Sequence, residues 1–362
     1  MGIEFTNGFT VTPINRSLYD FTTFTFTSVN INGPNPPSLA QFRGAYTGSA
    51  TWASNSSYFT TQSGFSGYQL WTVPQNGTYE IEVAGASSGR INHSGVSGSI
   101  ASGSKMRAQF SLQQNQKLLI VVGQHSANVT QVATYAALGG GGGTFVVPSG
   151  SNSGSINPLI VAGGGGGIGA WSSALPVVSG SQLFGRTTTS GGRAAFGELG
   201  GVSGSGGRSH VTSSLNLYDG GGGGGFAVGI SGSGMNGNGS YTTAASSNQG
   251  FGGKGFWTGS VGGGNSTTYP APGTSPGGFG GGGGAGPITG GGGGGYSGGA
   301  GNGRNTNTAP DSGGGGGSYI SSSAINVATA DGNYETLSNF NALPITTIGY
   351  HSGSGYVKIT RL

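Results

Sequence analysis

Residues 139–167 read GGGGGTFVVPSGSNSGSINPLIVAGGGGG, so two runs of five glycines enclose two apolar segments and a polar turn. The apolar segments, residues 144–147 and 158–161, have the composition of short strands. A polar turn between two such segments predicts a β-hairpin over residues 144–162. The glycine runs are therefore expected to be woven into a β-domain instead of being joined to it by a linker.

Glycine tracts recur in the following part of the chain. They occupy residues 139–143, 163–167, 220–225, 280–284, 290–295 and 313–317. An array of similar segments predicts a repeat whose units stack on one another. The unit that we expect is a polyglycine II helix, which has the geometry of polyproline II, with three residues per turn and a rise of about 3.1 Å per residue.

A polyglycine II helix has no internal hydrogen bonds, so its backbone N–H and C=O groups must pair with neighbouring helices. We therefore expect the tracts to form a bundle in which side chains are excluded from the packed faces. One glycine in each tract is assigned a structural role: Gly141, Gly165, Gly222, Gly282, Gly292 and Gly315. Aromatic residues after four tracts are expected to seal the bundle against the β-domain: Phe145, Phe226, Tyr296 and Tyr319.

Strand patterns dominate outside the tracts. Residues 21–27 are rich in aromatic and β-branched residues, and residues 78–83 alternate with period two, so each is expected to be a strand with one buried face. Residues 117–122 are apolar on both faces, as in a central strand. No segment of ten residues shows a helical apolar period, so we expect an all-β sandwich with almost no α-helix. Residues 355–360 are expected to close it by pairing with a strand among the first 138 residues. The expected core is Trp71, Tyr79, Ile81, Val83, Leu118, Ile120, Val146, Ile160, Val357 and Ile359.

These patterns divide the chain into four parts. We expect an N-terminal arm over residues 1–30, the first part of the sandwich over residues 31–138, the glycine bundle over residues 139–317, and closing strands over residues 318–362. The hairpin over residues 144–162 belongs to the sandwich although it lies within the bundle region. Loops between the tracts carry aromatic and polar side chains.

Composition narrows the classes of partner. The 13 basic residues are spread thinly, and a net charge of +4 without a dense basic stripe argues against nucleic acid. No apolar run approaches a membrane span, and no basic and apolar leader follows Met1, so neither membrane insertion nor export is expected. The chain contains no cysteine, which excludes disulfides and thiolate metal sites.

Several segments, in chain order, resemble the glycine-rich domain of the anaplastic lymphoma and leukocyte receptor tyrosine kinases, a domain shared with marine bacterial and phage proteins. The matching segments include YQLWTVPQNGTYEIEVAGA at 68–86, FSLQQNQKLLIVVGQ at 110–124, PLIVAGGGGG at 158–167 and TGGGGGGYSGG at 289–299. The resemblance implies a tumour-necrosis-factor-like jelly-roll sandwich with an inserted bundle of polyglycine helices. The cysteines, signal peptide, membrane span and kinase domain of those receptors have no counterpart here, so receptor signalling does not carry over.

The catalytic patterns in the sequence are weak. Residues 85–89 and 295–299 match G-x-S-x-G, but a chain this rich in Gly and Ser matches by chance, and no helix is expected to follow. Glu80 and Glu82 share a strand face and resemble a glycosidase pair, although a solvated face is the preferred interpretation. The four histidines lack metal-ligand spacing. We expect no enzyme activity, no cofactor and no metal site, with a calcium site left open.

The expected function is host recognition by a virion protein. Variable loops on a rigid scaffold suit a surface protein, and glycine tracts joined by loops resemble polyglycine-sandwich adhesins of phage tail fibres. Candidate receptor-binding residues are the aromatic and Arg types that dominate binding hot spots: Trp171, Phe184, Arg186, Tyr241, Trp257 and Tyr269. We expect several of them to be exposed at one end of the bundle, where they contact a host glycan or an outer-membrane protein.

The remaining expectations concern the particle. A phage tail-fibre or tail-tip protein would be made in the bacterial cytoplasm and bind other virion tail proteins, with the N-terminal arm facing the virion. A trimer is the favoured oligomer. The main alternative is a purely structural virion subunit of a fibre, collar or capsid decoration. Ice binding and glycan depolymerase activity are further alternatives.

Overall fold

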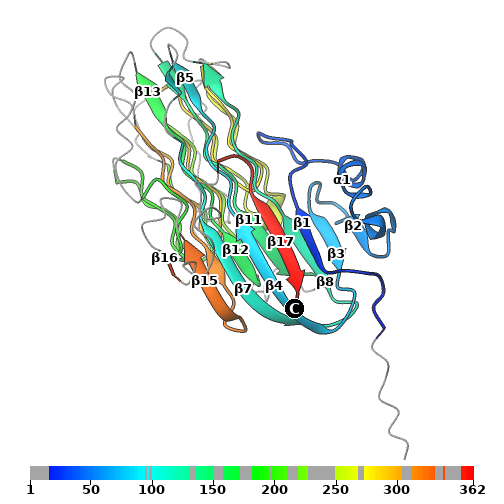
Figure 1. Cartoon of the computed structure of the whole chain (residues 1–362). Helices are drawn as coiled ribbons and strands as arrows, with labels where there is room; N and C mark the ends of the chain where they lie inside the picture. The colour runs from blue at the N-terminus through cyan, green and yellow to red at the C-terminus, as the bar shows by residue number, and fades with distance from the viewer. Residues whose placement is uncertain are drawn as a thin grey trace, which may run out of the picture.

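The computed structural model describes residues 16–93, 96–97, 100–130, 135–150, 158–171, 182–195, 197–209, 219–226, 249–267, 273–303, 311–330, 337–338 and 352–362. Two six-stranded antiparallel sheets form a sandwich at one end of the molecule, and long extended segments run from it toward β5 and β13 at the other end (Figure 1). The sheets do not close into a barrel. The all-β fold that the strand patterns predicted is confirmed.

The first sheet has the order β1-β17-β4-β7-β15-β16, and the second has the order β14-β12-β11-β8-β3-β2. The first sheet contains β1 (Thr23–Phe26), β17 (Tyr356–Arg361), β4 (Gly77–Ala84), β7 (Lys105–Leu112), β15 (Ile325–Ala330) and β16 (Leu337–Ser338). The second contains β14 (Tyr319–Ile320), β12 (Ile160–Ala162), β11 (Thr144–Pro148), β8 (Lys117–Val121), β3 (Gln69–Thr72) and β2 (Phe59–Thr61). The predicted hairpin over residues 144–162 is confirmed as β11 and β12.

Smaller elements complete the chain. Two short sheets are formed by β10 (Tyr135–Ala137) with β13 (Gly169–Trp171), and by β6 (Val96–Ser97), β5 (Ile91–His93) and β9 (Val129–Thr130). The 3₁₀ turns are η1 (Thr51–Ser54) and η2 (Phe256–Thr258). The single described α-helix, α1 (Leu39–Tyr46), begins at Ser38 because a capping box with Gln41 pairs the backbone N–H groups at its first turn.

The sandwich core lies between the two sheets. All ten residues expected in the core are fully buried and belong to one cluster. Along β4, Tyr79, Ile81 and Val83 point inward, while Glu80 and Glu82 point outward, as period-two alternation requires. Both faces of β8 are buried, because Leu118 and Ile120 face the core while Leu119 and Val121 face the bundle.

The C-terminal strand closes the first sheet. β17 lies between β1 and β4, with Val357 opposite both Phe26 and Val83. This confirms the predicted pairing with a strand from the first 138 residues. The expected boundary of the N-terminal arm at residue 30 is therefore too late, because β1 is a strand of the sandwich and Phe26 is fully buried. Only residues 1–15 of the expected arm lie outside the described residues.

The tract at 290–295 forms the centre of the bundle. Its N–H groups donate to three neighbouring segments, and the acceptor advances by three residues whenever the donor does. Gly291 and Gly294 donate to Leu138 and Gly141, Gly292 and Gly295 to Gly221 and Gly224, and Gly290 and Gly293 to Asp311 and Gly314. A repeat of three residues in three directions is the pattern of a polyglycine II helix, so this expectation is confirmed.

The carbonyl groups of the central tract accept from three further segments. Gly164 and Gly167 donate to Gly294 and Gly291, Gly283 donates to Gly292, and Gly299 and Asn302 donate to Gly293 and Gly290. Six segments therefore surround the central helix. They also bond to one another in a closed ring, through Gly141 to Gly165, Gly313 to Gly167, Gly314 to Ala300, Gly220 to Asn302, Gly221 to Gly284 and Gly140 to Gly283.

Close packing explains why the tracts are glycine. An added Cβ would lie 1.9 to 2.4 Å from a neighbouring carbonyl oxygen at each assigned structural position: Gly141, Gly165, Gly222, Gly282, Gly292 and Gly315. The tract at 280–284 differs from expectation in its first two residues. Gly280 and Gly281 have φ values of 101° and 86°, and Gly282 N–H bonds back to Gly278, so this tract begins as a turn.

A second layer of extended segments surrounds the ring, and the glycine tracts alone did not predict it. It includes residues 85–89, 191–193, 205–208, 250–255 and 261–264. Each segment donates backbone hydrogen bonds to the ring, through Ala86 to Gly142, Gly192 to Gly315, Gly207 to Gly223, Gly253 to Gly222 and Gly263 to Gly282. The bundle is therefore wider than six tracts.

Aromatic residues join the bundle to the second sheet. Phe145, Phe226, Tyr296 and Tyr319 belong to one cluster, which confirms that the residues after these tracts seal the two parts together. Phe226 stacks between Phe145, with ring centroids 6.4 Å apart, and Tyr296, at 6.1 Å. Burial of several aromatic rings against a sheet stabilises this junction, since each ring removes a large apolar area from water.

Candidate binding groove between the sandwich and the bundle

Among the described residues, two of the predicted receptor-binding side chains, Phe184 and Trp257, lie in different clusters. Phe184 is 9% exposed and packs in a cluster with Ile168 and Leu183. Trp257 is half-buried in the aromatic cluster at the junction, where its ring lies 5.0 Å from that of Phe256. The expectation that these two side chains are exposed together at one end of the bundle is wrong, because the hydrophobic effect places both in apolar clusters.

The other candidates have different surroundings. The guanidinium of Arg186 donates to Gln182 Oε1 at 2.7 Å and to Thr188 Oγ1 at 3.3 Å. Trp171 is the last residue of β13 and lies opposite Tyr135 in the ladder. Tyr241 and Tyr269 lie outside the described residues.

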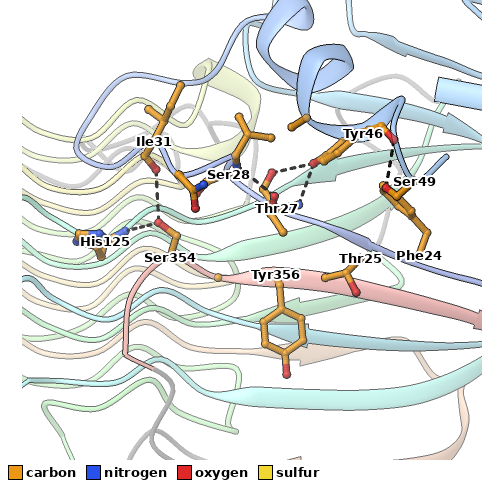
Figure 2. Close-up of a pocket in the computed structure, with 14 residues that line it drawn as sticks. Phe24, Thr25, Thr27, Ser28, Ile31, Tyr46, Ser49, His125, Ser354 and Tyr356 are labelled. Atoms are coloured by element: carbon orange, nitrogen blue, oxygen red, sulfur yellow. Dashed lines mark hydrogen bonds between the residues drawn. The ribbon is translucent and has the colours of Figure 1, made fainter. Parts of the chain in front are cut away.

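A groove of about 670 Å³ lies where the sandwich meets the bundle (Figure 2). Four segments line it: β1 with the turn after it, the C-terminal end of α1 with Ser49, His125 after β8, and the start of β17. The volume is in the range of pockets that hold small organic molecules. None of its 14 lining residues is Asp, Glu, Lys or Arg.

The turn at the groove is strained. Ile31 N–H donates to Ser28 O at 3.0 Å, and the two central residues, Val29 and Asn30, have φ values of 48° and 62°. Positive φ at both central positions identifies a type I′ turn. Asn tolerates this conformation, but a β-branched residue such as Val29 is an outlier there. Strain of this kind concentrates at sites where the chain must hold side chains in a particular place.

Histidine and serine side chains form one end of the groove. His125 Nδ1 lies 2.7 Å from the carbonyl oxygen of Ser126, so Nδ1 carries the proton in the neutral ring and Nε2 is left as an acceptor. Ser354 Oγ accepts from His125 N–H at 3.4 Å and lies 3.5 Å from Ile31 O. These contacts fix the loop before β17 against the turn after β1.

Tyr46 holds the opposite wall. Its hydroxyl accepts from Thr27 N–H at 2.9 Å, and its single O–H proton has two acceptors within reach, Thr27 O at 3.0 Å and Gln69 Oε1 at 2.9 Å. Burial raises the pKa of Tyr46 to about 12, and its hydrogen bonds only partly offset this. The groove therefore presents the neutral hydroxyl of Tyr46. The backbone N–H and C=O of Thr27, the residue after β1, are already in contact with that hydroxyl.

Tyr356 contributes an aromatic surface. Its hydroxyl donates to the carboxylate of Glu82, and Lys105 Nζ lies 5.7 Å from the centre of its ring. Both contacts restrict the ring, which lines the groove beside Thr25 (Figure 2). Glu82, considered in the sequence as half of an acid pair, instead accepts from this tyrosine and lies between Arg107 and Lys358 in the ladder.

No sequence pattern marked this groove. Its residues come from four segments far apart in the chain, and only tertiary structure brings them together. The one local signal is Asn30, since Asn favours positive φ in turns. The serine of the first G-x-S-x-G match, Ser87, is 1% exposed in an extended bundle segment and is not presented as a nucleophile elbow would present it.

Among the described residues, no three His, Asp or Glu side chains gather as a metal site would require. In the same part of the chain, no helix has the length and apolarity to cross a bilayer. The sequence matches no protein-family model, and its comparison with curated proteins gives no match.

Proposed function

We propose that this chain is a non-enzymatic bacteriophage virion protein, a tail-fibre or tail-tip adhesin that binds a host surface receptor. The observation that carries the proposal is the packing of the bundle around residues 290–295. A scaffold bonded in six directions keeps its shape when its outer surface changes, because surface side chains take no part in its backbone pairing. Such a scaffold suits a protein that must vary its recognition surface.

The outer segments of the bundle supply recognition surface. Leu199, Val202 and Phe251 are 41%, 59% and 44% exposed, and Arg208 and Lys254 are exposed on the same segments. Together with Arg186 they replace Phe184 and Trp257 as the candidate contacts among the described residues. Of these side chains, Phe251, Arg186 and Arg208 are of the aromatic and Arg types that are enriched at protein interfaces.

Immunogold labelling of purified phage particles tests this proposal. Antibody raised against the full chain should label the tail tip or fibre, and purified chain added to host cells should reduce phage adsorption. Absence of the chain from the particles would contradict the proposal. Labelling confined to the capsid or collar would support the second candidate, a structural subunit, which is favoured by the burial of Phe184 in an apolar cluster.

We also propose that sandwich and bundle form one glycine-rich domain of the anaplastic lymphoma and leukocyte receptor kinase type, with a jelly-roll sandwich. The interleaving of strands and tracts supports this, since β11 follows the tract at 139–143 and β12 precedes the tract at 163–167. An experimental structure with a different strand order from that domain would contradict the assignment.

A further inference from the structure

We propose that the groove between the sandwich and the bundle binds an uncharged saccharide. This inference goes beyond the proposed function, because the groove is separate from the outer bundle segments. It rests on the chemistry of the lining residues, which combine hydroxyl, amide and imidazole groups with aromatic rings and include no Asp, Glu, Lys or Arg. A saccharide carries hydroxyl groups on a carbon ring with C–H faces, so it matches both the polar groups and the aromatic rings of the groove.

Polar partners for sugar hydroxyls lie at the end of the groove where His125 meets the turn after β1. His125 Nε2 is an acceptor because Nδ1 is committed to Ser126 O. Asn30 carries an exposed amide that both donates and accepts, and the strained turn fixes its backbone. Sugar hydroxyls need such paired donors and acceptors, and a few well-placed polar groups give a pocket its specificity.

The apolar side of a saccharide would lie against Tyr356. The ring is held at its hydroxyl by Glu82 and is approached by Lys105, so it loses little further freedom when a ligand binds. Pre-organised aromatic rings contribute contact area at low entropic cost. The flat ring of Tyr356 suits the C–H face of a pyranose, whereas the ring of Phe24 packs against Tyr46 and Trp52 in the core.

Two other ligand classes fit less well. Phosphates and acidic sugars require cationic partners, and no Lys or Arg lines the groove. A peptide that extends the first sheet along β1 could not continue past the end of that strand, because Tyr46 contacts both the N–H and the C=O of Thr27, the residue after β1. An uncharged saccharide avoids both difficulties.

Saccharide titration of the purified full chain, followed by calorimetry or amide chemical shifts, tests the inference. The probes are neutral oligosaccharides of glucose, galactose, mannose and N-acetylglucosamine, with uronic acid and sialic acid oligosaccharides as the acidic panel. We expect at least one neutral saccharide to bind with a dissociation constant of about 1 mM or below. The shifted amides should be those of Asn30, His125 and Tyr356.

Matched variants locate the site. Asn30→Gly keeps the positive φ but removes the amide, and His125→Leu removes the acceptor, so each should weaken binding about tenfold or more. Asn115→Gly is the control, since Asn115 is exposed at φ 67° in a turn away from the groove, and it should bind as the parent does.

No binding at about 10 mM, preference for the acidic panel, or equal binding by all three variants would each overturn the inference. Binding of an extended peptide with shifts along β1 would overturn it in favour of strand addition. Phage adsorption is a separate measurement, so adsorption that survives Asn30→Gly leaves the proposed function standing.

Discussion

Gly294 donates its backbone N–H to the carbonyl oxygen of Gly141 at 2.9 Å, and Gly291 repeats this bond to Leu138 three residues earlier in both segments. The pair shows why the central tract tolerates no side chains: each of its residues faces a neighbouring backbone. Specificity in this molecule comes from hydrogen-bond period and close approach, whereas the sandwich obtains it from apolar side-chain packing.

Gly292→Ala should destabilise the fold by about 3 kcal/mol or more, since its Cβ would lie 2.1 Å from Gly299 O in a backbone that cannot move away. Gly44→Ala is the matched control. Gly44 lies within α1 with open space around its Cβ, so alanine should stabilise the protein by about 0.5 to 1 kcal/mol. Urea denaturation measures both changes. Equal stability of the two variants would contradict the packing of the bundle.

Ile120→Ala should cost about 2 to 5 kcal/mol, because Ile120 is fully buried between the two sheets. Ile325→Ala, at a position that is 57% exposed on β15, should change the free energy of unfolding by no more than about 0.5 kcal/mol. Chemical denaturation of the two variants separates the outcomes. A cost below about 1 kcal/mol for Ile120→Ala would show that the sheets do not share this core.

Gln124→Met should leave stability unchanged or raise it by about 1 kcal/mol. Gln124 is fully buried beside the bundle, and among the described residues neither its amide nitrogen nor its amide oxygen has a hydrogen-bond partner. Methionine of similar length removes the desolvation cost and keeps the packing. Thermal unfolding monitored by near-UV circular dichroism measures the change. A fall in the unfolding temperature of several degrees would indicate that the amide is paired.

Stability should fall as the pH rises above 10. Burial raises the pKa of Tyr46 to about 12 in the folded state, against 10.0 as its ordinary value, and it also raises the pKa of Tyr68 and Tyr79. A raised pKa means that the folded state keeps a proton that the unfolded state loses, so the stabilisation is complete below pH 10 and declines through pH 12.

Lys105 acts in the opposite sense, because burial lowers its pKa below the ordinary value of 10.5. The folded state therefore loses this proton at a lower pH than the unfolded state does, so the contribution of Lys105 to stability rises as the pH approaches 10.5. Urea denaturation between pH 8 and pH 11 measures the balance. The free energy of unfolding of the Tyr46→Phe variant should fall less steeply above pH 10 than that of the parent protein. Parallel curves for the two proteins would contradict the assignment to Tyr46.

Patterns in the sequence predicted much of the fold because they are local. Alternation in β4 placed Ile81 and Val83 in the core, and aromatic residues after tracts, such as Phe226, marked the junction. The second layer of the bundle was missed because its glycines are interrupted. Its signal was a period of three residues in exposure. Phe251 and Lys254, three residues apart, are exposed, whereas Gly253 between them is buried.

The groove and the receptor-binding assignments could not be predicted in the same way. Hot-spot residue types are also the types that fill apolar clusters, so composition alone did not separate Trp257 at the junction from an exposed ring. The groove depends on His125 and Ser354 meeting the turn at Asn30, which only the closure of the first sheet by β17 brings about. Tertiary contacts between distant segments leave no local signal.

Amide hydrogen exchange of residues 290–295 tests the central claim most directly, that the glycine tracts form a hydrogen-bonded bundle continuous with the sandwich. Each of these N–H groups is bonded and buried, so they should exchange only through global unfolding, with the same opening free energy as the amides of β8. Exchange at the rate of an unstructured glycine peptide, while β8 stays protected, would contradict the account.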